Sequence, residues 1–204
     1  MPRIAVFFLL LMALLLVHFA LLRAGLIFRN RADTGGATLR ELASSFLTGA
    51  RFDLAIAAYV LAPFALFAFL PGIALDRSRR HRRIFFPALM SVLGVVTFIC
   101  LAEYEFFHEF QTRYNRLAIQ YLDQPATVAG MAWYNYPVLR YVLGWLFVMA
   151  LFGFALHRLM RWSFETLPAP ALQISRRRIV MELGAVVAII AIWVLSMRGG
   201  VGGE

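Results

Sequence analysis

Five long apolar runs restrict what this chain can fold into. They cover residues 4–22, 54–75, 84–102, 138–156 and 179–197. A helix needs roughly 20 apolar residues to cross the hydrocarbon core of a bilayer, and each run has about that length. Hydrophobic residues make up 62% of the 204 residues and charged residues only 15%, so a soluble domain could not bury the apolar surface. The sequence predicts an all-α integral membrane protein with five transmembrane helices, followed by a Gly-rich linker or terminus at residues 199–204.

The arginines predict an N-terminus inside the cell and a C-terminus outside. With that orientation, the inward-facing segments hold the whole formal net charge of +9, whereas the outward-facing segments balance to zero. In membrane proteins, the loops on the cytoplasmic side carry more arginine and lysine than the loops on the outer side. A basic run at residues 77–83 could instead bind nucleic acid or anionic lipid, but a short loop between two spans favours a topology signal. The inner arginines are Arg3, Arg77, Arg79, Arg80, Arg82, Arg83, Arg158, Arg161, Arg176, Arg177 and Arg178.

Two outer segments have the pattern of amphipathic helices that lie in the membrane interface. Thr38 and Glu41 form a capping box before a short helix with one apolar face. Residues 103–137 place phenylalanines and tyrosines opposite charged side chains, with Pro125 as an interruption and aromatic anchors near Trp133. This second segment predicts either an interfacial helix or a surface that docks a lipid headgroup or an extracytoplasmic domain.

Chemistry-bearing residues are few, and we find no catalytic centre in the chain. Glu105, His108 and Glu109 share a helix face, but a single Glu-x-x-His motif is too little for a di-iron bundle, and we expect no metal site. His18 and His157 lie at opposite depths, about 20 Å apart, so they cannot share a haem. Glu182, inside the fifth run, can pair with Arg178 four residues earlier, and we leave its role open.

Several short motifs resemble the lipoteichoic-acid-synthase-like phosphoglycerol transferases, whose catalytic domain is sulfatase-like. The first is Gly49-Ala-Arg-Phe-Asp-Leu-Ala-Ile-Ala-Ala-Tyr59, followed by Leu61-Ala-Pro63. The second is Glu103-Tyr-Glu-Phe-Phe-His-Glu-Phe110 with Arg113-Tyr-Asn115 and Tyr121-Leu122. Tyr136-Pro137 and Arg198-Gly-Gly200 continue the pattern, so the resemblance is spread over most of the chain.

The resemblance implies five N-terminal helices in the bacterial cytoplasmic membrane, which agrees with the topology derived above. It also implies an extracytoplasmic domain with a Thr nucleophile and Mn or Mg, which moves phosphoglycerol from phosphatidylglycerol to an envelope polymer or glucan. That catalytic domain is absent from this chain, whose sequence stops at Glu204. We therefore leave enzymatic activity open, and expect no cofactor in this chain.

The charged residues of these motifs are the candidate sites for a lipid headgroup or for domain docking. They are Arg51, Asp53, Glu103, Glu105, Arg113 and Asn115. A guanidinium at the membrane boundary can hold a phosphate with two hydrogen bonds, and Asp53 can fix Arg51. Alternatively, Arg51–Asp53 and the Glu103/Glu105–Arg113/Arg116 set form structural ion pairs that join the outer segments to the bundle.

These observations lead to a hypothesis of a membrane anchor that presents phosphatidylglycerol to a catalytic domain, in cis or in trans. The alternative is a standalone membrane scaffold or assembly protein without enzymatic activity. The chain has no nucleic-acid motif. It lacks the paired acids inside the spans that a transporter would need. The sequence does not identify the acceptor, the metal, the oligomeric state or whether the chain is complete.

Overall fold

The computed structural model of the protein describes residues 3–30, 36, 38–69, 75, 79–112, 123–166 and 184. All regular elements in these residues are helical. They are α1 (Arg3–Arg29), α2 (Leu39–Phe69), α3 (Arg79–Phe110), α5 (Pro125–Asn135) and α6 (Val138–Arg161), followed by a π-helical turn η2 (Trp162–Thr166). Four of them, α1, α2, α3 and α6, are long and apolar enough to cross a membrane. The predicted fifth span, residues 179–197, and Glu182 lie outside the described residues.

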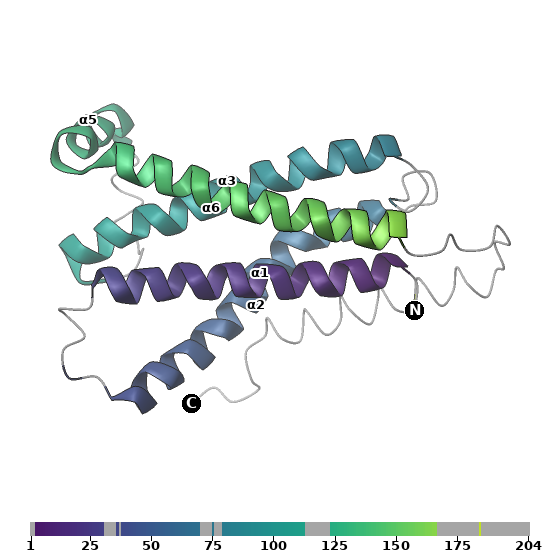
Figure 1. The fold of residues 1–204 in the computed structure, drawn as a ribbon. Coiled ribbons are helices and arrows are strands. Elements are labelled where there is room, and N and C mark those ends of the chain that lie inside the picture. Colours follow the sequence, from purple (N-terminus) through teal and green to yellow (C-terminus); the bar gives the residue numbers. More distant parts are fainter. Residues whose placement is uncertain are drawn as a thin grey trace, which may run out of the picture.

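The four long helices alternate in direction along the bundle, as Figure 1 shows. One end, called the Asn30 end here, holds the end of α1, the starts of α2 and α6, the end of α3, and α5. The other, called the Arg79 end, holds the start of α3 and the end of α6. Arginines dominate the described charges of the Arg79 end, whereas the Asn30 end holds six acids with five arginines. The alternation agrees with successive membrane crossings.

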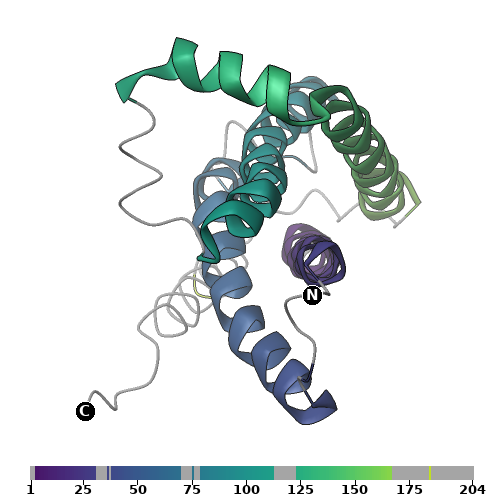
Figure 2. The same cartoon turned by 90° about the vertical axis from the view of Figure 1, so that its left-hand side faces the viewer.

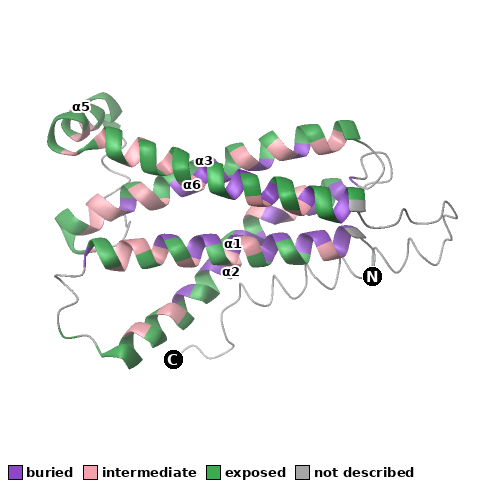
Figure 3. Cartoon of the chain, viewed as in Figure 1, coloured by how far each residue is buried: buried purple, intermediate pink, exposed green. Residues whose placement is uncertain are grey.

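Helix α1 is the central helix because it is apolar around its whole circumference. It packs against α2, α3, α6 and η2. Half of the residues in its most apolar stretch are buried inside the protein. Figure 3 shows buried residues along α1, whereas α6 is largely exposed. Phe7 of α1 contacts Phe85 of α3 and Phe164 of η2, with ring centroids 5.9 and 5.0 Å apart. Exposed apolar side chains on α6, such as Phe147, suit a surface that faces lipid tails.

Two polar contacts tie the helices together inside the bundle. His18 Nε2 lies 2.9 Å from Thr97 Oγ1, between α1 and α3, and both side chains are buried. Trp145 Nε1 of α6 donates to the carbonyl oxygen of Gly94 on α3 at 2.9 Å. A Cβ atom at Gly94 would lie 3.4 Å from Trp145 Cζ2, at van der Waals contact, so Trp145 packs directly over this glycine.

Most of the helices extend beyond the predicted apolar runs, but the second run is an exception at its far end, because α2 ends at Phe69 and Leu75 lies in a turn. Helix α2 begins at Leu39 and continues to Phe69, so the short helix expected after Thr38 and the second span are one helix. The polar stretch between them contains no proline, and Gly49 alone does not interrupt a helix. Its 31 residues extend about 46 Å, more than the ~30 Å of a hydrocarbon core. The Asn30 end of α2 diverges from α1 in Figures 1 and 2.

The segment after α3 is only partly described. Helix α3 continues to Phe110, and Gln111 follows in a left-handed conformation with φ 50°, which ends the helix. Pro125 is the first residue of α5, where its missing N–H costs nothing. Figures 1 and 2 show α5 lying crosswise to α6 at the Asn30 end. Trp133 and Tyr134 of α5 are 66% and 87% exposed.

Candidate functional site

A groove of about 830 Å³ opens between α1, α2 and α3 at the Asn30 end. We call it the α1–α2–α3 groove. Its walls combine apolar side chains with a row of hydroxyl groups from α2 and with charged groups. The apolar lining includes Phe19, Leu22, Leu26, Ile27, Phe52 and Ile56, and the polar lining includes Arg23, Thr38, Arg40, Glu41, Ser44, Ser45, Thr48, Asp53, Glu103 and Tyr104.

An ion pair between α1 and α2 closes the base of this groove. Arg23 Nη2 lies 2.5 Å from Asp53 Oδ2, and the two side chains are only 14% and 12% exposed. Arg23 Nη1 also donates to the carbonyl oxygen of Phe46 at 3.0 Å, and the guanidinium lies over the Phe46 ring. The pair is therefore held by contacts along two turns of α2, and its charges compensate each other in a site of low dielectric constant.

Gly49 makes room for Arg23. A Cβ atom at this position would overlap the guanidinium group of Arg23, which lies across the face of α2. The glycine lies one turn before Asp53 and one turn after Ser45, so it shares the groove face of the helix. A small residue at position 49 is thus a condition for the Arg23–Asp53 pair.

The start of α2 is fixed by the predicted capping box, which the structure confirms. Glu41 Oε2 accepts from the Thr38 backbone N at 2.7 Å and from Thr38 Oγ1 at 2.9 Å. Thr38 Oγ1 accepts from the backbone N of Glu41 at 3.3 Å. These bonds satisfy N–H groups that would otherwise be unpaired at a helix start. They also fix the rim of the groove beside Arg40.

A second cleft, of about 610 Å³, lies between the end of α3 and the start of α6, and we call it the α3–α6 cleft. Both carboxylate oxygens of Glu105 accept bonds from Arg29 at the end of α1, at 3.0 and 3.3 Å. The Tyr141 hydroxyl of α6 donates to the same carboxylate. Glu105 therefore connects α1, α3 and α6. His108, Glu109, Asn135 and Arg140 line the rest of the cleft.

The six predicted site residues do not form one site. Asp53 and Glu103 are buried and line the α1–α2–α3 groove, whereas Glu105 lines the α3–α6 cleft. Arg51 is exposed and lines neither. Arg113 and Asn115 lie outside the described residues. The sequence predicted ion pairs that join the outer segments to the bundle. The structure has such pairs at Asp53 and Glu105, but their partners are Arg23 and Arg29 of α1.

The partners of Asp53 and Glu105 were missing from the sequence candidates, and they are Arg23, Arg29 and Tyr141. One signal could have indicated Arg23. Residues 51 and 53 point to different sides of a helix because they are two positions apart, so Asp53 has to find a partner elsewhere. Arg23 ends an apolar run and lacks a local acid, which makes it a suitable partner. Tyr141 carries no comparable signal, since a tyrosine near the start of a span is typical of a membrane interface.

No residues in the described part of the chain form a metal site. Groups of three or more His, Cys, Asp or Glu side chains that could hold an ion are absent there. Glu105 is held by Arg29 and Tyr141 instead. The α1–α2–α3 groove and the α3–α6 cleft can form hydrogen bonds and ion pairs with a ligand that has polar and apolar parts.

Comparison of the chain with protein-family models, with curated proteins and with solved structures gives no match.

Proposed function

We propose that this chain is a membrane-anchoring domain that presents phosphatidylglycerol to a phosphoglycerol transferase of the bacterial cytoplasmic membrane. In this proposal the Asn30 end faces outside, the crosswise α5 lies in the interface, and the catalytic domain acts in cis or in trans. The observation that carries the proposal is the composition of the α1–α2–α3 groove, because its two kinds of lining match the two parts of a phospholipid.

The apolar wall suits an acyl chain, and the face of α2 suits a headgroup rich in hydroxyls. Ser44, Ser45 and Thr48 offer hydroxyl groups that can donate to and accept from the glycerol of the headgroup. Arg40, exposed at the rim, can bind the phosphate. The phosphate belongs at the rim, since the buried Glu103 would repel it at the base and Arg23 is paired with Asp53 there.

Native mass spectrometry of the purified chain with lipids added tests the proposal. Phosphatidylglycerol should bind more tightly than phosphatidic acid with the same acyl chains, because only the former carries a glycerol headgroup. Arg40→Ala should weaken phosphatidylglycerol binding about tenfold, the effect of one lost charge-assisted contact. Arg80→Ala, an exposed arginine at the Arg79 end, is the matched control and should change nothing.

Two further variants sharpen the result. The double variant Ser44→Ala/Ser45→Ala should lower phosphatidylglycerol affinity to that of phosphatidic acid, and Arg51→Ala tests the candidate from the sequence in the same assay. Equal binding of the two lipids, with no effect of Arg40→Ala, would overturn the lipid-presenting role and favour the scaffold alternative.

A further inference from the structure

The α3–α6 cleft holds two opposite charges that its own contacts leave free. Arg29, Glu105 and Tyr141 are engaged with one another. Glu109 of α3 and Arg140 of α6 also line the cleft, and both are exposed. Within the part of the chain that the structure describes, these two side chains make no ion pair, either with each other or with another residue. The cleft therefore presents a separated anion and cation.

A ligand that carries both charges fits this arrangement better than a simple ion. A phosphate alone would meet the carboxylate of Glu109 in the same cleft as the guanidinium of Arg140. A lone amine would likewise meet the guanidinium of Arg140 in the same cleft as the carboxylate of Glu109. A ligand with an ammonium group and a phosphodiester satisfies both, because the carboxylate accepts from the ammonium and the guanidinium donates to the phosphate.

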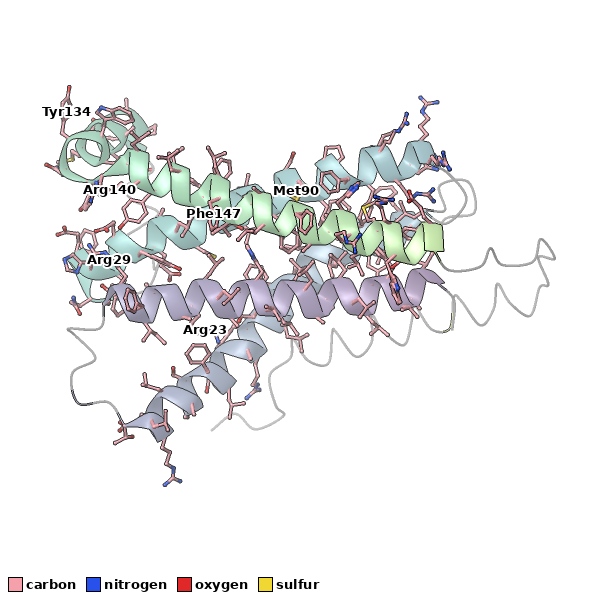
Figure 4. All side chains as sticks on the ribbon, viewed as in Figure 1. Arg23, Arg29, Met90, Tyr134, Arg140 and Phe147 are labelled. Atoms are coloured by element: carbon pink, nitrogen blue, oxygen red, sulfur yellow. The ribbon has the colours of Figure 1, made fainter. Side chains whose placement is uncertain are left out.

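The position of the cleft indicates a lipid as the source of such a group. It lies at the Asn30 end, where α5 crosses the bundle with Trp133 and Tyr134 exposed, and such aromatic side chains favour the headgroup level of a bilayer. Figure 4 shows Arg140 and Arg29 at this end, at the start of α6 and the end of α1. A phospholipid can enter from the bilayer with its tails still in the hydrocarbon region.

We propose that the α3–α6 cleft binds the headgroup of a zwitterionic phospholipid, with the ammonium at Glu109 and the phosphodiester at Arg140. This site is separate from the α1–α2–α3 groove, so it stands or falls independently of the phosphatidylglycerol proposal. In this proposal the Asn30 end of the bundle binds two kinds of lipid, the anionic phosphatidylglycerol in the α1–α2–α3 groove and a zwitterionic phospholipid in the α3–α6 cleft.

Binding of phosphatidylethanolamine and phosphatidylglycerol to the purified chain, each measured by native mass spectrometry, tests the site. Glu109→Gln should weaken phosphatidylethanolamine binding about tenfold and leave phosphatidylglycerol binding unchanged, because only the former carries an ammonium. Arg140→Gln should weaken phosphatidylethanolamine binding to a similar extent. Asp123→Asn, an exposed acid outside the cleft, is the matched control for the loss of a negative charge.

Selective loss of phosphatidylethanolamine in Glu109→Gln, with Asp123→Asn unchanged, supports the proposal. Unchanged phosphatidylethanolamine binding in Glu109→Gln overturns it, and so does an equal loss in Asp123→Asn. Soluble glycerophosphoethanolamine provides the second arm. If it competes with the lipid at equal concentration, the cleft recognises a free zwitterion and the lipid source is wrong.

Discussion

Arg23 of α1 and Asp53 of α2 form an ion pair with an Nη2–Oδ2 distance of 2.5 Å at the base of the α1–α2–α3 groove. The pair joins the first two membrane helices near the point where α2 diverges from α1. It also decides which arginines are available to a ligand, because it engages Arg23 and leaves Arg40 at the rim.

Removal of one partner should destabilise the bundle strongly. Asp53→Ala leaves the guanidinium of Arg23 nearly buried without its carboxylate, and we expect a loss of about 3–5 kcal/mol in unfolding free energy. Denaturant titration in detergent, followed by circular dichroism, measures it. Arg161→Ala is the control, because the Arg161–Glu165 pair is about half exposed and should contribute about 1 kcal/mol or less. Equal losses in the two variants would refute a structural role for the Arg23–Asp53 pair.

Gly49→Ala should act through Arg23. The added methyl group would occupy the space of the guanidinium, so Arg23 must move and the contacts to Asp53 and Phe46 weaken. Gly144→Ala on α6 is the matched control, because its added methyl group would have no neighbour within 4 Å beyond the adjacent residues and the backbone of its own helix. It should stabilise the protein by about 0.5–1 kcal/mol. Thermal unfolding of both variants should therefore shift in opposite directions, and a shared direction would contradict the account.

Labelling of single cysteines tests the proposed orientation. In a Cys100→Ser background, Asp123→Cys at the Asn30 end should react with a membrane-impermeant maleimide in intact cells. Arg80→Cys at the Arg79 end should react only after the membrane is permeabilised, because arginine-rich ends stay inside. The reverse pattern would invert the bundle and place both hollows on the cytoplasmic side.

The spans were predictable from the sequence because the bilayer imposes a length on every apolar helix. Residues 4–22, 84–102 and 138–156 lie within helices that are long and apolar enough to cross a membrane, and α2, the fourth such helix, covers residues 54–69 of the second run. The helix ends were less predictable. Arg23 to Arg29 and Glu103 to Phe110 are polar or mixed in character, yet they continue α1 and α3, since backbone hydrogen bonds do not depend on hydropathy.

The site was predictable only in part. Asp53, Glu103 and Glu105 became candidates because they are charged residues of the motifs that resemble the phosphoglycerol transferases, at the outer boundary of the apolar runs. Their partners depend on tertiary packing, which short sequence spacing does not encode. The pairs Arg23–Asp53 and Arg29–Glu105 join residues far apart in the chain, whereas the sequence suggested the nearby Arg51 and Arg113. Ser44, Ser45 and Thr48 could be recognised as the lining of a groove only from the structure, in which α2 is one continuous helix beside α1.

The most direct test of the account is the position at which phosphatidylglycerol contacts the chain. A phosphatidylglycerol with a photoreactive group near its headgroup would be added in trace amounts to nanodiscs, and the cross-linked peptides would be mapped by mass spectrometry. The account predicts adducts enriched in residues 38–56, at Thr38 and the first part of α2, and in residues 19–27 of α1, with the enrichment lost in Arg40→Ala. Adducts no more frequent there than on the lipid-facing surface around Phe147 would contradict it.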